Sequence, residues 1–118
     1  MANANIGALA LNPQNMISPA VNGGTLGASL GTGSVQVLAA DAQRQKVTFH
    51  NPGTIDLFVC QAFDSAGNPL TAGPNPGNWL IFPGGLLTFT GNGVAGAWLG
   101  AARSASGNPL SMASSQTI

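Results

Sequence analysis

The chain has 118 residues and carries almost no charge: three Lys or Arg balance three Asp or Glu, so charged residues make up 5% of the sequence and the formal net charge is zero. Average globular proteins contain about 25% charged residues. Two nearby cations, Arg44 and Lys46, are too few to neutralise a run of phosphates, which excludes nucleic acid as the main partner.

The composition also argues against a membrane partner. Clustered basic residues bind an anionic membrane surface, and a spanning helix needs roughly 18 consecutive apolar residues; the sequence has neither. The N-terminus lacks a basic start and a long apolar stretch, so we expect no signal peptide. A single cysteine, Cys60, leaves no internal disulfide and fits synthesis in a reducing cytoplasm.

Residues 1–33 are rich in Asn, Ala, Gly and Ser and contain the breakers NPQN, SPA and NGG. They nevertheless hold too many apolar side chains for a solvated linker. We therefore predict an extended N-terminal arm over 1–33 that packs against another surface, followed by a β-sandwich domain over 34–118. The residues expected to make this contact are Ile6, Leu9, Leu11, Ile17 and Val21.

The arm contains GASLG (27–31), a formal match to the nucleophile elbow of α/β-hydrolases, with Asp41 and His50 following in the order of a catalytic triad. That motif works on a strained strand-to-helix turn in a parallel sheet, whereas Ser29 lies in a Gly-rich arm of a short chain. We therefore predict no catalytic residue and no enzyme activity.

From residue 34 onward, short β-type runs alternate with Gly, Pro, Asn and Asp, which predicts an all-β domain. Val47 and Phe49 alternate with polar residues, as in a half-buried strand. The run 56–63 is apolar on both faces, which predicts a central strand or one whose outer face is an interface. We expect six or seven strands, at 34–40, 46–51, 56–63, 79–82, 85–91, 96–103 and, as the seventh, 109–115.

The uncharged segment NWLIFPGGLLTFTG (78–91) reads as two apolar strands folded back on each other at Pro83, Gly84 and Gly85. One face of this predicted hairpin would lie on the core of the domain. No window has the apolar spacing of an amphipathic helix. The predicted fold class is all-β, an antiparallel β-sandwich or jelly roll with an extended N-terminal arm.

The chain holds one His, one Cys, three Asp and no Glu, too few for a metal site. We predict no metal and no cofactor. Cys60 and His50, on strands that follow each other in the sequence, are interpreted as a buried thiol and a strand histidine. Asp64, in DSAGN, is expected to cap a turn rather than bind calcium, because the spaced acidic ligands of a calcium loop are missing.

Most of the aromatic residues lie on alternating strands and are expected in the core. Trp79 is the exception, since it follows the Pro- and Gly-rich loop 72–78 and could mark the rim of an interaction surface. The predicted interface residues are Trp79, Leu80 and Phe82.

The runs VLAADAQRQKVTFHNPG, DLFVCQAF, FPGGLLTFTG and GAWLGAA, within residues 35–103, together resemble small structural proteins of tailed bacteriophages. The resemblance implies a small β-sandwich bound to a virion, above all a capsid decoration or cement protein that joins neighbouring major capsid subunits. Arg44 matches the Arg of the family pattern and Asn51 the Asn that closes its strand; both are interpreted as structural supports.

Two functions follow as hypotheses. In the first, the chain decorates and stabilises the shell of a tailed phage, with the major capsid protein and further copies of itself, as a dimer or trimer, as partners. It would be made in the cytoplasm of the host bacterium and reside on the capsid surface of the virion. In the second, it is a head-fibre, collar or tail-associated module that contacts host carbohydrate through Trp79 and loop 72–78.

Overall fold

The computed structural model describes residues 25–116, which form eight strands and one short 3-10 turn. The strands are β1 (Thr25–Leu30), β2 (Val35–Leu38), β3 (Lys46–His50), β4 (Leu57–Gln61), β5 (Trp79–Ile81), β6 (Leu86–Thr90), β7 (Trp98–Ala102) and β8 (Asn108–Ser115), and the turn η1 is Asn92–Val94. Within the described range no helix is long and apolar enough to cross a membrane.

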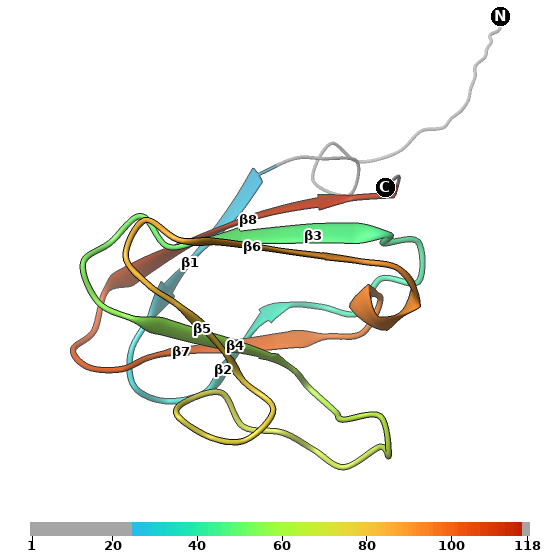
Figure 1. Ribbon diagram of the computed structural model, residues 1–118, viewed down its shortest axis with the longest axis horizontal. Helices are drawn as coiled ribbons and strands as arrows, with labels where there is room; N and C mark the ends of the chain where they lie inside the picture. The colour runs from blue at the N-terminus through green and yellow to red at the C-terminus, as the bar shows by residue number, and fades with distance from the viewer. Residues whose placement is uncertain (1–24, 117–118) are drawn as a thin grey trace, which may run out of the picture.

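The strands form two four-stranded sheets that lie face to face (Figure 1). Sheet I has the order β1-β8-β3-β6 and sheet II the order β2-β7-β4-β5, with every neighbouring pair antiparallel. The pairs β1·β8, β2·β7, β3·β6 and β4·β5 are those of one long hairpin wrapped into two layers, which is the strand order of a jelly roll. The predicted all-β sandwich is confirmed.

The core lies between the sheets and follows the two-residue period of the strands. In β3, Val47 and Phe49 are fully buried while the residues between them are partly exposed, as the alternation predicts. Phe49 and Phe89 contact the buried ring of Trp98, with ring centroids 5.1 and 5.0 Å away. The other buried apolar residues of this cluster are Leu30, Leu38, Leu57, Val59, Ile81, Val94, Ala102, Leu110 and Met112.

Strand β1 corrects the predicted extent of the arm. Residues 25–30 pair along their whole length with β8, and Leu30 is completely buried in the core. The composition of this stretch, with Gly27, Ala28 and Ser29, concealed a strand whose inward positions are 26, 28 and 30. The sandwich therefore begins at Thr25, not at residue 34.

The segment 78–91 does not form the predicted hairpin. β5 pairs with β4 in sheet II and β6 pairs with β3 in sheet I, so the turn between them carries the chain from one sheet to the other. This turn has Pro83 and Gly84 at its centre and is closed by the Gly85 N–H, which donates to the Phe82 carbonyl at 2.7 Å. Gly84 has φ 79°, as the third position of a type II turn requires.

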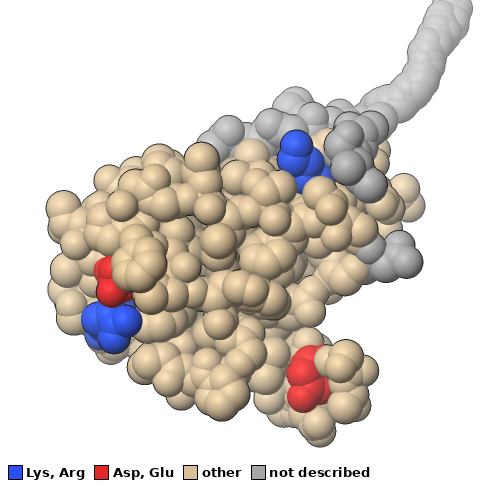
Figure 2. Space-filling model, in the orientation of Figure 1, with Lys and Arg blue, Asp and Glu red and all other residues tan. Residues whose placement is uncertain are grey.

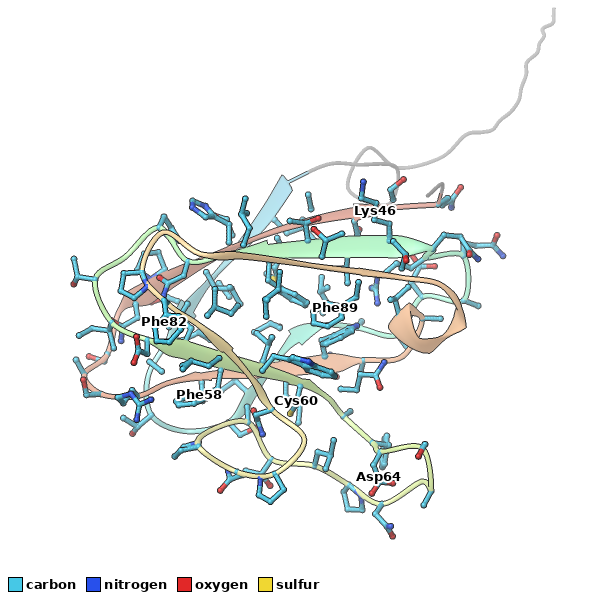
Figure 3. The ribbon with its side chains drawn as sticks, in the orientation of Figure 1. Lys46, Phe58, Cys60, Asp64, Phe82 and Phe89 are labelled. Carbon is cyan, nitrogen blue, oxygen red and sulfur yellow. The ribbon has the colours of Figure 1, made fainter. Side chains whose placement is uncertain are left out.

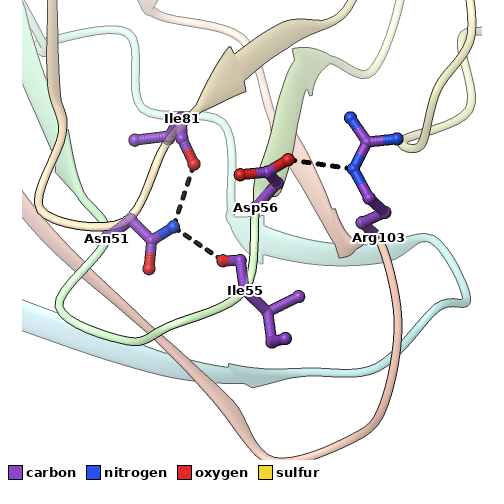
Figure 4. A network of polar contacts seen from close by, with 5 residues as sticks. All are labelled: Asn51, Ile55, Asp56, Ile81 and Arg103. Atoms are coloured by element: carbon purple, nitrogen blue, oxygen red, sulfur yellow. Dashed lines mark hydrogen bonds and ion pairs between the residues drawn. The ribbon is translucent and has the colours of Figure 1, made fainter.

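Asn51 fixes this turn against the rest of the fold. It is completely buried, its backbone N–H donates to the Gly85 carbonyl, and its own carbonyl accepts from Gly84. Its side-chain amide donates to the carbonyls of Ile55 and Ile81 at 2.8 and 2.9 Å (Figure 4). These bonds direct the chain from sheet II into β6 beside β3. Without them, two adjacent apolar strands in the sequence would predict a hairpin.

The outer face of sheet II is covered by its own loop. The central strand β4 is buried on both faces, and Cys60 on its outer side packs with Ala72 and Ala101 beneath the loop 62–78. Figure 1 shows this loop extending from the sheet II side of the sandwich. The apolar outer face of β4 is thus that of a central strand, one of the two alternatives that the sequence left open.

Candidate interaction surface

Several exposed apolar residues lie close together in the sequence where β5 passes into β6. Six large hydrophobic residues are exposed in the described chain, and three of them, Trp79, Phe82 and Leu86, lie within eight positions of one another. The other three are Leu26, Val35 and Phe63. The region from Trp79 to Leu86 is therefore the first place to look for a partner.

The three predicted interface residues do not share one face. Trp79 lies on the core side of β5, as Ile81 does, and its ring contacts Phe89 at 4.8 Å and Trp98 at 6.0 Å between ring centroids. It remains 42% exposed because β5 is the edge strand of sheet II. Leu80 has the opposite orientation in the strand and is half-buried, and Phe82, just beyond the strand, is 62% exposed.

Phe82 lies beside a second feature that the sequence analysis missed. Arg103 Nε donates to Asp56 Oδ2 at 2.9 Å (Figure 4), and the Arg103 guanidinium lies 5.1 Å from the centroid of the buried Phe58 ring. The pairing of β4 with β5 ends at Leu57 and Ile81, so Asp56 and Phe82 are the next residues of the two chain segments at this end. Figure 3 shows Phe82 and Phe58 at the same end of the sandwich. We call Asp56, Phe58, Phe82 and Arg103 the Phe82 patch.

The sequence contains one signal for this patch, an acidic and a basic residue at opposite ends of two predicted strands, 56–63 and 96–103. Asp56 begins the first predicted strand and Arg103 ends the second. Because neighbouring antiparallel strands bring the start of one beside the end of the other, the two residues meet across the sheet, where the Arg103 N–H also donates to the Asp56 carbonyl at 2.9 Å. Only knowledge of the β4·β7 pairing could have revealed the contact.

Few charged side chains lie on the face of the molecule that Figure 2 shows. Of the three cationic residues, Arg44 is 4% exposed and donates to the carbonyls of Ala39, Val94 and Gly96, whereas Arg103 is paired with Asp56. Burial lowers the pKa of Arg44, and the nearby Asp41 carboxylate acts in the opposite direction. Among the Lys and Arg residues of the described chain, Lys46 is thus the one that is neither buried nor part of an ion pair.

The residues of the candidate triad lie on separate elements. Ser29 lies within β1 opposite Pro109, not on a strand-to-helix turn, and Asp41 lies in the loop after β2. His50 lies on the outer side of β3, facing away from the core. The geometry that the nucleophile elbow requires is therefore not formed around Ser29.

The contacts of Cys60, His50 and Asp64 are those of residues with a structural role. Cys60 lies on the outer side of sheet II and His50 on the outer side of sheet I, so the sandwich separates them. Burial raises the pKa of the Cys60 thiol. Asp64 Oδ1 accepts hydrogen bonds from the N–H groups of Ala66 and Asn68 at 2.9 Å, which confirms its turn-capping role. Among residues 25–116 no three His, Cys, Asp or Glu side chains come together as a metal site would need.

The predicted capsid-binding residues Ile6, Leu9, Leu11, Ile17 and Val21 lie outside the described residues. Comparison with protein-family models, with curated proteins and with solved structures finds no match to this chain. The Phe82 patch and the low surface charge are therefore the features from which a function can be argued.

Proposed function

We propose that this chain is a virion structural protein of a tailed phage, a decoration or cement protein that binds the shell of major capsid subunits and stabilises it. The Phe82 patch and the arm residues Ile6, Leu9, Leu11, Ile17 and Val21 would make the contacts. The observation that carries the proposal is an exposed apolar and aromatic surface on a domain with almost no free charge.

This surface is more typical of a protein that stays bound in an assembly than of a free monomer. Soluble domains usually carry a net charge of about 2 to 8, which keeps molecules apart. Here the net charge is zero, so binding to a neighbour would be driven by apolar burial, at roughly 25 cal/mol per Å². Aromatic and Arg side chains are enriched at the centres of protein interfaces, and the Phe82 patch combines both.

The position of β1 defines where the arm starts. Because residues 25–30 belong to the sandwich, a chain truncated before Thr25 keeps the whole jelly roll. The 24 preceding residues, if extended, would span at most roughly 80 Å, enough to cross onto a neighbouring capsid subunit. Ordering such a segment costs about 1 to 2 kcal/mol per residue, so the arm needs extensive contact on the shell.

The test is co-sedimentation of the purified chain with shells that lack it. We expect the wild type to bind shells and to remain bound at 1 M salt, where the Debye length is about 3 Å and surface charge attraction is screened. Phe82→Ser and removal of residues 1–24 should each weaken binding by about tenfold or more. The matched control is Phe63→Ser, because Phe63 has a similar exposed fraction, 58%, but lies on loop 62–78.

Binding of the wild type that is abolished by moderate salt would contradict contact through apolar burial. Retained full binding by both Phe82→Ser and the truncated chain would contradict the assignment of the contact surface. Absence of binding by the wild type to shells would remove the cement function itself.

A second candidate function rests on the exposure of Trp79. Its ring is held by Phe89 and Trp98 yet stays 42% exposed beside loop 72–78, so it offers a fixed aromatic surface on which a sugar ring could stack. Two Asn side chains of this loop are engaged within it, since Asn75 and Asn78 both donate to the Thr71 carbonyl. Quenching of tryptophan fluorescence by host glycans in the wild type, and its loss in Trp79→Ala, would favour this function.

A further inference from the structure

The strands β1 and β2 form the edges of the two sheets at one side of the sandwich. β1 is an edge strand of sheet I, β2 is an edge strand of sheet II, and the short turn 31–34 joins them. Neither strand contains a charged residue or a proline, which are among the features that keep exposed edges from pairing with other chains. Natural proteins also protect such edges by laying a loop over them. A covering segment is therefore expected at this side of the sandwich.

A groove lies between the start of β1 and the end of β2. It has a volume of about 370 Å³ and is open to the surface, and its walls include Leu26, Leu38, Ala39, Ala40, Asp41 and Arg44. Leu26 occupies an inward position of β1 yet is 36% exposed, whereas Leu30, at another inward position of the same strand, is completely buried. Apolar area on the core side of β1 thus remains accessible where the strand begins.

The wall of the groove also carries a hydrogen-bond donor without an acceptor. The two terminal nitrogens of Arg44 donate to backbone carbonyls, but its buried Nε–H has no acceptor among the described residues. A buried donor without an acceptor is destabilising. A peptide segment packed against Arg44 can supply a backbone carbonyl, whereas a purely apolar ligand cannot.

The chain that precedes Thr25 starts beside this groove, because Leu26 is one of its walls. Residues 1–24 contain no Lys, Arg, Asp or Glu. The two charges in the groove wall, Asp41 and Arg44, are of opposite sign and interact with each other, so the groove suits an uncharged segment. The residues NGG at 22–24 favour a turn, which would fold the preceding residues back over the groove.

The tether to β1 favours this segment over a separate molecule. Val21 is the first large apolar residue before β1, and the five positions between it and Leu26 span at most roughly 17 Å. A group held by such a short flexible linker has an effective concentration of about millimolar. A separate partner, the arm of a second copy included, would have to reach that concentration to compete equally. The chain's own segment is therefore the occupant that the connectivity favours.

We propose that the groove between β1 and β2 is the seat of this chain's own segment 18–24, with the Val21 side chain packed against Leu26. A backbone carbonyl of the segment accepts from Arg44 Nε. The proposal goes beyond the proposed function and narrows the arm, since Val21 then contacts the domain and not the shell. The arm residues that remain for the shell are Ile6, Leu9, Leu11 and Ile17.

The first experiment traps the contact by a disulfide in the full chain. Val21→Cys is combined either with Ala40→Cys, in the groove, or with Ala113→Cys, which lies opposite Thr25 on the outward side of β8. Each pair is oxidised at low protein concentration, and Cys60 is completely buried and stays out of reach.

An arm that moves freely from the start of β1 would reach both positions alike. We expect the pair with Ala40→Cys to close within one chain at least about tenfold faster than the pair with Ala113→Cys, as a preference of about 1.4 kcal/mol for the groove gives. Equal rates for the two pairs, or disulfides formed mainly between chains, would overturn the proposal.

The second experiment measures the stability of the full chain by chemical denaturation. Val21→Ser should raise the equilibrium constant for unfolding by about tenfold or more, because it removes a buried Val side chain. Leu9→Ser is the matched control, a similar apolar truncation in the part of the arm left for the shell, and should change the constant by about twofold or less. An unchanged constant in Val21→Ser, or the same change in both variants, would contradict the docking of this segment.

Both experiments use the isolated chain without shells. Their failure would therefore leave the cement function untouched, whereas a chain that shows the docked segment but does not bind shells would keep this inference and lose the cement function.

Discussion

The side-chain amide nitrogen of Asn51 lies 2.9 Å from the carbonyl oxygen of Ile81, thirty residues later in the chain. The same side chain binds Ile55, and its oxygen accepts from the Gly53 N–H at 3.0 Å. One buried side chain thus joins the end of β3, the approach to β4 and the end of β5. It holds the turn that presents Phe82.

Asn51→Ala is expected to lower the free energy of unfolding by about 2 to 3 kcal/mol, because it leaves the buried Ile81 carbonyl without its donor. Chemical denaturation measures this change. Asn68→Ala is the control, since Asn68 is exposed and its loss should cost well under 1 kcal/mol. Equal effects of the two substitutions would contradict the role given to Asn51.

Gly84 and Gly85 should resist substitution for two different reasons. Gly84 has a φ of 79°, which costs an Ala about 1 to 2 kcal/mol, whereas a Cβ on Gly85 would lie 2.8 Å from the Phe82 carbonyl oxygen. Both variants should lower the melting temperature. Gly33→Ala, where a Cβ would meet no atom within 4 Å, should change the free energy of unfolding by about 0.5 kcal/mol or less.

Cys60 should resist thiol reagents in the folded protein, because it is completely buried and burial raises its pKa, while the thiolate is the reactive form. Leu70→Ser should speed its labelling by roughly tenfold, since losing the contact of this loop residue costs on the order of 1.4 kcal/mol of local closure. Leu86→Ser, on the other sheet, should not. Rapid labelling of the wild type would show that loop 62–78 does not seal this face.

Asp64 should titrate below its ordinary pKa of 3.8. The Asn68 backbone N–H is the main cause, followed by the Asn68 side chain and other N–H groups of the same turn, all of which stabilise the carboxylate. Since the pKa is lowered in the folded state, the turn gains stability above the unfolded pKa and loses it as the pH falls through the folded value. Carboxyl NMR titration measures this, and a midpoint above 3.8 would contradict the turn geometry.

The sequence predicted the fold best in strands whose own pattern of apolar and polar residues shows which side is buried. Val47 and Phe49 alternate with polar residues, so the core face of β3 could be predicted from residues alone. The residues of β4 are apolar on both sides, which left two alternatives, a central strand or a strand whose outer face is an interface. β1 was missed because Gly27, Ala28 and Ser29 have the composition of a loop, and its burial depends on β8, whose paired residues lie about eighty positions later.

The candidate surface was less predictable, because it depends on which strands pair. Neighbouring apolar strands at 78–91 favour a hairpin, but hydrogen bonds from Asn51 direct them to different sheets. The β4·β7 pairing places Asp56 against Arg103, and the alternation of side chains along β5 separates Trp79 from Leu80. The Asn51–Ile81 bond and the Asp56–Arg103 contact do not follow from local sequence, since each depends on a partner at least thirty residues away.

Counting this chain against the major capsid protein in purified particles, by quantitative mass spectrometry, tests the cement function most directly. A shell-wide cement predicts near parity, or hundreds of copies per particle. A count of about five to a dozen, as five- or six-fold symmetric vertices, collars and tails would give, or absence from particles, would contradict it.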